Sequence, residues 1–185
     1  MIRMIMTYSQ NNNDMLTPHF RVGEFKCKCG GNHGIKLDCE LVEKLEELRT
    51  YLDCSRIIIN SGFRCPEHDR RVGGNGGGMH TKGQAADIVC YDRQGDIIPA
   101  GVVCCAAQEV GFNGIANIDN TYTAVHVDTR SGSKWYGDEA VPGGTSSSVC
   151  EDFYEYYPDV KPVGEIKTGM IEIDGVKYKY TLEKA

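Results

Sequence analysis

The sequence predicts an α+β fold, in which helices pack on a small and mostly antiparallel sheet. Short apolar runs at residues 56–60 and 85–90 have the length and composition of buried strands. Residues 122–128 are alternating and rich in β-branched side chains, which is typical of a strand with one buried face. Other segments show helical periodicity, so we expect the helices and the sheet to share one core.

The first half of the main domain begins with an irregular segment at residues 17–24. Asp38 then caps a helix that runs to about residue 52. Five apolar residues fall on one face of this helix: Leu41, Val42, Leu45, Leu48 and Leu52. The strand at residues 56–60 follows, and Pro66 opens a short helix because proline fits the first helical turn.

The second half begins with a glycine-rich loop at residues 73–78, which leads towards the strand at residues 85–90. Pro99 starts a second helix, which continues through Val110 and ends at Gly111. Strands at residues 114–118 and 122–128 then complete the mixed sheet.

The composition divides the chain into four parts. We expect a flexible N-terminus at residues 1–16, the main domain at 17–140, a linker-like segment at 141–164 and a β-hairpin at 165–185. Asp174 and Gly175 are the two-residue signal of a type I′ turn. One hairpin is too small to be an independent domain.

The 185 residues carry a net charge of −6, which argues against nucleic acid or an anionic membrane as the main partner. No stretch has the length of a membrane span, and the N-terminus lacks the apolar core of a secretory signal. We expect a monomer.

His80, Asp87 and His126 form the most informative pattern in the chain. Two imidazoles and a carboxylate are a ligand set of catalytic zinc, which lowers the pKa of its water so that the water can attack an amide. Asp87 is the one charge inside an apolar strand and therefore needs a partner or a metal. The sequence predicts a zinc hydrolase.

The motifs SGFRCPEHDRRVGG, MHTKGQAADI and VHVDTR, with a Trp soon after, resemble the M15-type zinc peptidases over about residues 17–136. These enzymes are D-alanyl-D-alanine carboxypeptidases and L-alanyl-D-glutamate endopeptidases that cut peptidoglycan stem peptides, in a fold shared with the Hedgehog signalling domain. By this resemblance, His80, Asp87 and His126 match the zinc ligands, and Arg64 matches the arginine that reads a substrate carboxylate.

Arg64 and Asp128 are the other two candidate site residues. A guanidinium offers a planar fork to a carboxylate, although a structural salt bridge from Arg64 to Asp69 or Glu67 is the alternative. Many relatives carry an acidic general base three residues before the second histidine, and Thr123 stands at that position here. Asp128 is the nearest replacement, either as the base or as a carboxylate that orients an imidazole.

Nine cysteines leave the redox compartment open. Cys27, Cys29 and Cys39 flank a Gly-Gly turn, with His33 between them. A second, structural zinc and a disulfide are alternatives there, but Cys-x-Cys differs from the usual Cys-x-x-Cys spacing, so we expect free thiols.

Two other classes of function stay open at this point. The first is a non-catalytic zinc-containing module that binds cell wall or peptide, and the second is a structural domain such as a virion component. A wall-cutting enzyme without a leader would reach its substrate after lysis, through a holin or by other export, and a phage or prophage lysin fits that case.

Overall fold

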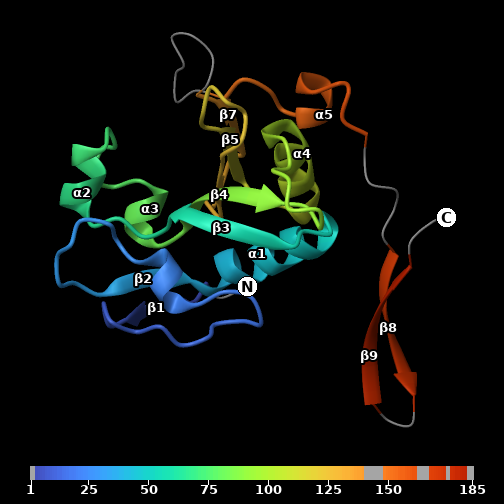
Figure 1. The fold of residues 1–185 in the computed structure, drawn as a ribbon, viewed down its shortest axis with the longest axis horizontal. Coiled ribbons are helices and arrows are strands. Elements are labelled where there is room, and N and C mark those ends of the chain that lie inside the picture. The colour runs from blue at the N-terminus through green and yellow to red at the C-terminus, as the bar shows by residue number, and fades with distance from the viewer. Residues whose placement is uncertain (1–2, 140–147, 162–166, 174–175, 183–185) are drawn as a thin grey trace.

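The computed structural model describes residues 3–139, 148–161, 167–173 and 176–182, and its fold is α+β, as the sequence predicts (Figure 1). A five-stranded sheet with the order β3-β4-β6-β5-β7 forms the centre. Its strands are β3 (Arg56–Ser61), β4 (Ala85–Tyr91), β5 (Gly114–Asn117), β6 (Val125–Asp128) and β7 (Trp135–Asp138). Only the β5–β7 pair in this sheet is parallel, so the sheet is mostly antiparallel.

Two longer helices pack against each other, α1 (Cys39–Tyr51) and α4 (Ala100–Val110), and α4 also contacts β5 and β6. The Asp38 carboxylate caps α1 by accepting a hydrogen bond from the Glu40 N–H. Gly111 ends α4 with a φ of +86°, a conformation that favours glycine. Four shorter helices are η1 (Val22–Phe25), α2 (Pro66–Arg71), α3 (Met79–Lys82) and α5 (Phe153–Tyr156). None of the helices in the described ranges is long and apolar enough to cross a membrane.

The two faces of the central sheet have different chemistry. On one face, apolar side chains of neighbouring strands pair in register and enter the core, as Ile59 with Ile88 and Ala86 with Val127. The intervening residues of β4 and β6 point the other way, because successive side chains of a strand alternate. The face opposite the apolar core therefore carries Asp87, His126 and Asp128, and it is called the polar face below.

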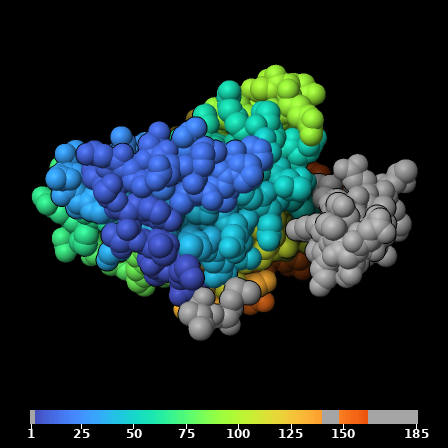
Figure 2. Space-filling view, turned by 90° about the horizontal axis from the view of Figure 1, so that it is seen from below, coloured from blue at the N-terminus to red at the C-terminus, as the bar shows by residue number. Residues whose placement is uncertain are grey.

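The N-terminal segment contains a strand that the expectation of a flexible residue range 1–16 does not include. β1 (Ile5–Tyr8) pairs in antiparallel register with β2 (Ile35–Asp38). The side chains of Ile5 and Met6 are exposed and Tyr8 packs against the core, so β1 is held mainly by its backbone hydrogen bonds. Composition alone gives no sign of such an edge strand. In Figure 2 this blue N-terminal part of the chain spreads over one face of the molecule.

Part of the segment expected to be linker-like packs on the main domain. Residues 140–147 lie outside the described residues, but Ser148 forms a bridge with Gly137 at the edge of the sheet. Phe153 in α5 is fully buried, and its ring stacks on that of Tyr136 at a centroid distance of 4.8 Å. The aromatic residues of α5 thus extend the core of the main domain.

Two further expectations differ in detail. The strand predicted at residues 122–128 begins only at Val125, because Tyr122 has a φ of +56° and Thr123 closes a turn on the Asp119 side chain. The predicted hairpin is present as β8 (Lys167–Ile173) paired with β9 (Val176–Leu182) in antiparallel register. Its turn dipeptide, residues 174–175, lies outside the described residues.

Candidate metal centre

Three donor atoms from three separate elements meet on the polar face of the sheet. They are Nε2 of His80 in α3, Oδ1 of Asp87 in β4 and Nδ1 of His126 in β6. Nε2 of His80 lies 3.2 Å from Nδ1 of His126 and 3.2 Å from Oδ1 of Asp87, and the remaining distance is 3.0 Å. The sequence-predicted ligands are therefore in mutual contact.

This triangle has the size that a zinc ion requires. Zinc bonds to nitrogen and carboxylate oxygen of about 2.0–2.1 Å in a tetrahedral arrangement place neighbouring donors about 3.3 Å apart. The three distances between His80, Asp87 and His126 are within a few tenths of an ångström of that edge. The donor set, two imidazoles and one carboxylate, also suits zinc. The residues present fit the ion.

The fold fixes the orientation of each ligand. Asp87 and His126 are direct cross-strand partners in the β4–β6 register. The ring of His80 is oriented by its Nδ1, which lies 2.7 Å from the carbonyl oxygen of Gly62. Because a carbonyl accepts, His80 Nδ1 carries the proton there and Nε2 keeps a lone pair for a metal.

Electrostatics keeps Asp87 in its anionic form. Burial by itself raises the pKa of Asp87, but its interactions with the imidazoles of His126 and His80 outweigh burial and hold the pKa well below its ordinary value. For His126 burial has the opposite effect and lowers the pKa, but the hydrogen bonds to Asp128 and Asp87 outweigh it and raise the pKa to about 9. The carboxylates thus create a strongly negative environment that a cation would occupy favourably.

Asp128 lies behind His126, on the side away from the other two ligands. Its Oδ2 is 3.0 Å from His126 Nε2, and the guanidinium of Arg130 donates to both carboxylate oxygens. Asp128 is fully buried, which by itself raises its pKa, but the bonds from His126 and Arg130 hold the pKa well below its usual range. The space for this carboxylate exists because Gly114 opposes it across the strands.

Arg64 contacts the triangle of candidate ligands from the side opposite Asp128. Its Nη2 donates to Oδ2 of Asp87, and its Nε donates to Ser61 at 2.8 Å. Its Nη1 also lies 3.7 Å from the buried carboxylate of Asp69, so one of the predicted salt bridges is present. The glycine-rich loop wraps that carboxylate, since Gly76 donates its N–H to Asp69 at 2.9 Å.

Sequence reasoning missed Arg130, whose one signal is its place two residues after Asp128. The guanidinium of Arg130 also lies over the Trp135 ring, 4.9 Å from its centre, and that ring packs edge-on to His126 at 6.1 Å. Trp135 therefore lines the candidate site. The adjacent Tyr136 instead points into the core.

A second cluster of metal-binding side chains differs from the one considered in the sequence. Cys27 and Cys29 lie close together, but Cys39 does not join them; His33 and Cys65 complete the group. Cys39 lies apart because it begins helix α1, whereas Cys65, the N-cap of α2, follows β3 and reaches the loop of Cys27 and Cys29.

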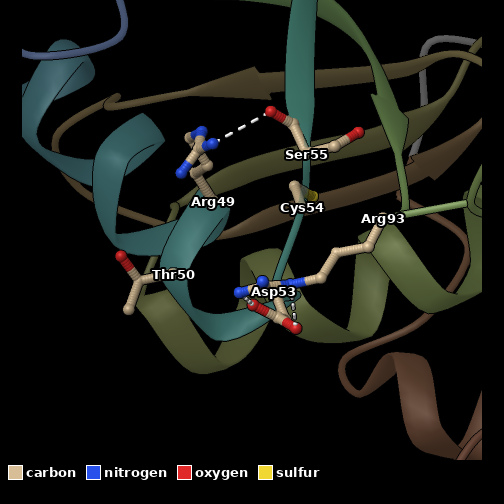
Figure 3. A pocket seen from close by; sticks show the side chains of 6 residues that line it. All are labelled: Arg49, Thr50, Asp53, Cys54, Ser55 and Arg93. Carbon is tan, nitrogen blue, oxygen red and sulfur yellow. Dashed lines mark hydrogen bonds and ion pairs between the residues drawn. The ribbon is translucent and has the colours of Figure 1, made fainter. Parts of the chain in front are cut away.

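A surface hollow elsewhere contains none of the predicted site residues. Figure 3 shows its lining residues: Arg49, Thr50, Asp53, Cys54, Ser55 and Arg93. Arg93 is engaged with the Asp53 carboxylate and Arg49 with the Ser55 carbonyl oxygen. Its arginines are thus already paired, and the hollow offers no set of converging catalytic groups.

Two comparisons with known proteins bear on these findings. A family model described as Peptidase M15 matches residues 18–128, which is more than half of the chain and includes every predicted site residue. A search of curated proteins finds no match.

Gly114→Ala tests the geometry of this centre. A β-carbon at residue 114 would lie 2.1 Å from Oδ2 of Asp128, so that carboxylate must move and release His126. We expect zinc affinity to fall about tenfold or more, with a loss of stability of about 1–3 kcal/mol. Zinc titration and thermal unfolding measure the two effects. Gly78→Ala is the matched control, since a β-carbon there meets nothing within 4 Å; equal zinc affinity in both variants would contradict the geometry.

Proposed function

Because the chain belongs to the Peptidase M15 family, we propose that it is a zinc-dependent peptidase that hydrolyses peptidoglycan stem peptides. The cut would be that of a D-alanyl-D-alanine carboxypeptidase or of an L-alanyl-D-glutamate endopeptidase. The observation that carries the proposal is the triangle of His80, Asp87 and His126, whose donor atoms have the spacing of a zinc site. Family membership supports a peptidase, and the triangle supports the metal.

The proposed zinc ligands are His80, Asp87 and His126. Zinc in such a site polarises a carbonyl group and makes water a stronger nucleophile at neutral pH. Three protein ligands are the number that catalytic zinc sites use. The protein supplies a preorganised arrangement, since a backbone carbonyl fixes the His80 ring and the strand register fixes the other two side chains.

Arg64 is the proposed binding group for a substrate carboxylate. Its guanidinium is partly exposed, with 19% of the side chain accessible, and it touches the outer oxygen of Asp87. A carboxylate held by the remaining N–H groups would therefore lie beside the metal ligands, and the position of the peptide bond would be fixed relative to them.

Asp128 is proposed to position His126 rather than to act as the general base. His126 and Arg130 already occupy its carboxylate oxygens, and the residue has no exposed surface. A carboxylate bound to the far nitrogen of a ligating imidazole fixes the ring and raises its basicity. Action as the base is the competing role, and it requires the carboxylate to reach the reacting water.

A non-catalytic binding module is the alternative function. Thr123 occupies the position of the usual acidic base, and its hydroxyl is bound to Asp119. With Asp128 engaged as well, the described contacts also suit a protein that keeps zinc and binds stem peptides without cutting them.

Incubation with defined muropeptides separates the two functions. We expect the zinc-loaded protein to release terminal D-alanine or to cut after L-alanine, as detected by mass spectrometry. His80→Ala and chelation of the metal should abolish cleavage, because the ligand triangle is then incomplete. His19→Ala, a change at a surface histidine paired with Glu46, should leave cleavage intact. Zinc bound at the triangle without any cleavage would favour the binding module.

The role of Arg64 can be tested on a substrate with a free carboxylate and on its amide. The wild-type protein should prefer the free acid by tenfold or more in kcat/KM, which is about 1.4 kcal/mol, and Arg64→Ala should remove most of that preference. Arg71→Ala, a change at an exposed residue of α2, should retain it. If Arg64→Ala slows both substrates equally, the arginine has only a structural role.

Asp128→Asn distinguishes positioning from base catalysis. For positioning, we expect zinc affinity to fall about 10- to 100-fold, with much of the activity restored at saturating zinc. For a base, zinc affinity would remain and kcat would stay low at every zinc concentration. Zinc titration combined with kcat measurements decides between them, and Asp53→Asn, at a surface carboxylate paired with Arg93, is the control.

A further inference from the structure

We propose that Cys27, Cys29, His33 and Cys65 bind a second zinc ion, which has a structural role. One donor atom from each of these residues lies within 4.8 Å of all the others. Three thiolates and one imidazole are a common ligand set of closed structural zinc sites. The inference concerns residues outside the catalytic triangle and does not depend on the proposed peptidase activity.

The distances are close to those of a zinc site. Zinc–sulfur bonds of about 2.3 Å in a tetrahedron place neighbouring sulfurs about 3.8 Å apart. The cluster is already gathered to nearly that size, and Sγ of Cys29 is 2.9 Å from Nε2 of His33. For an ion to bind all four donors, the most distant pair would have to approach by about an ångström or less.

Each of the three sulfurs also accepts a backbone N–H. Cys65 donates its N–H to Sγ of Cys27 at 3.3 Å, and Gly31 donates to Sγ of Cys29 at 3.2 Å. His68 donates to Sγ of Cys65 at 3.4 Å. A neutral thiol is a weak acceptor, whereas donors aimed at every sulfur stabilise thiolates and fix them as ligands.

Cys65 is an unusual residue for its place in the fold. It is the N-cap of α2, where serine, threonine, aspartate and asparagine are strongly preferred. A cysteine at such a position fits a second task, and its sulfur faces the loop that carries Cys27 and Cys29. That loop turns at Gly30, with a φ of +78°, and so returns His33 to the same point.

Zinc explains the cluster better than a disulfide or an iron–sulfur centre does. A disulfide would use two of the three sulfurs and leave the third sulfur and His33 without a role. Iron–sulfur clusters are most often held by four cysteines, whereas this group contains three. A set of three sulfurs and one nitrogen is common in structural zinc sites.

A zinc ion at the cluster would stabilise the turn that contacts His80 and Asp87 of the catalytic triangle. This turn, residues 62–65, connects the cluster to the triangle. Gly62 accepts the hydrogen bond from His80, Arg64 contacts Asp87, and Cys65 belongs to the cluster. Phe63 also donates its N–H to the carbonyl oxygen of Phe25, two residues before Cys27. Zinc at the cluster would thus lock the loop after η1 onto this turn.

Metal content of the full chain tests the proposal. We expect about two zinc ions per chain in protein purified under reducing conditions, and about one in Cys65→Ser and in Cys29→Ser. Cys39→Ser and Cys150→Ser, at two cysteines outside the cluster, should retain about two. The double variant His80→Ala/His126→Ala should retain about one, because it lacks only the catalytic triangle.

Cobalt substitution provides a readout that does not depend on the folding of a cysteine variant. In the His80→Ala/His126→Ala protein, cobalt should produce an intense thiolate charge-transfer band, and adding Cys65→Ser should weaken or remove it. The proposal is overturned if that double variant binds cobalt without the band or holds no metal, or if mass spectrometry finds a disulfide within the cluster. Cleavage of muropeptides is not part of this test, so either proposal can fail without the other.

Discussion

The cross-strand pair of Asp87 and His126 is the constraint on which the rest of the site depends. The β4–β6 register places these two side chains opposite each other on the polar face, while their neighbours Ala86, Ile88, Val125 and Val127 enter the core. A slip of one residue would move a carboxylate and an imidazole into the core and bring apolar side chains to the surface. The hydrophobic pattern that specifies the sheet therefore also brings together two of the candidate metal ligands.

The site is a chain of alternating charges rather than a set of separate ligands. It runs from Arg64 through Asp87, His126 and Asp128 to Arg130, with each group in contact with the next. Most of this chain is buried, and removal of one member leaves a buried charge without its partner, which is strongly unfavourable. The ligand geometry and the stability of this region are thus coupled, and Gly114 is a glycine because the Asp128 carboxylate occupies the space beside it.

The two proposed metal sites are connected by one short turn. Gly62, Arg64 and Cys65 lie in the turn that follows β3, and they contact the two sites. Gly62 also has no room for a side chain, since a β-carbon there would lie 2.7 Å from the backbone of Phe25. If the proposed second zinc is bound, it would make this loop more rigid, and the loop lies next to Arg64 and to the backbone carbonyl that orients His80.

Local patterns in the sequence determine the fold class, the Asp38 cap, the order of the core elements and the three candidate zinc ligands. These features follow from side-chain periodicity and residue type, which act over a few positions. Contacts between distant segments decide the rest: β1 is held by backbone bonds to β2, and Phe153 is buried against Tyr136. The same is true of Asp128, bound by Arg130 and His126, and of Cys65, which replaces Cys39 in the second cluster. These contacts depend on how the strands and loops converge in space. The spacing of residues along the chain does not predict that convergence.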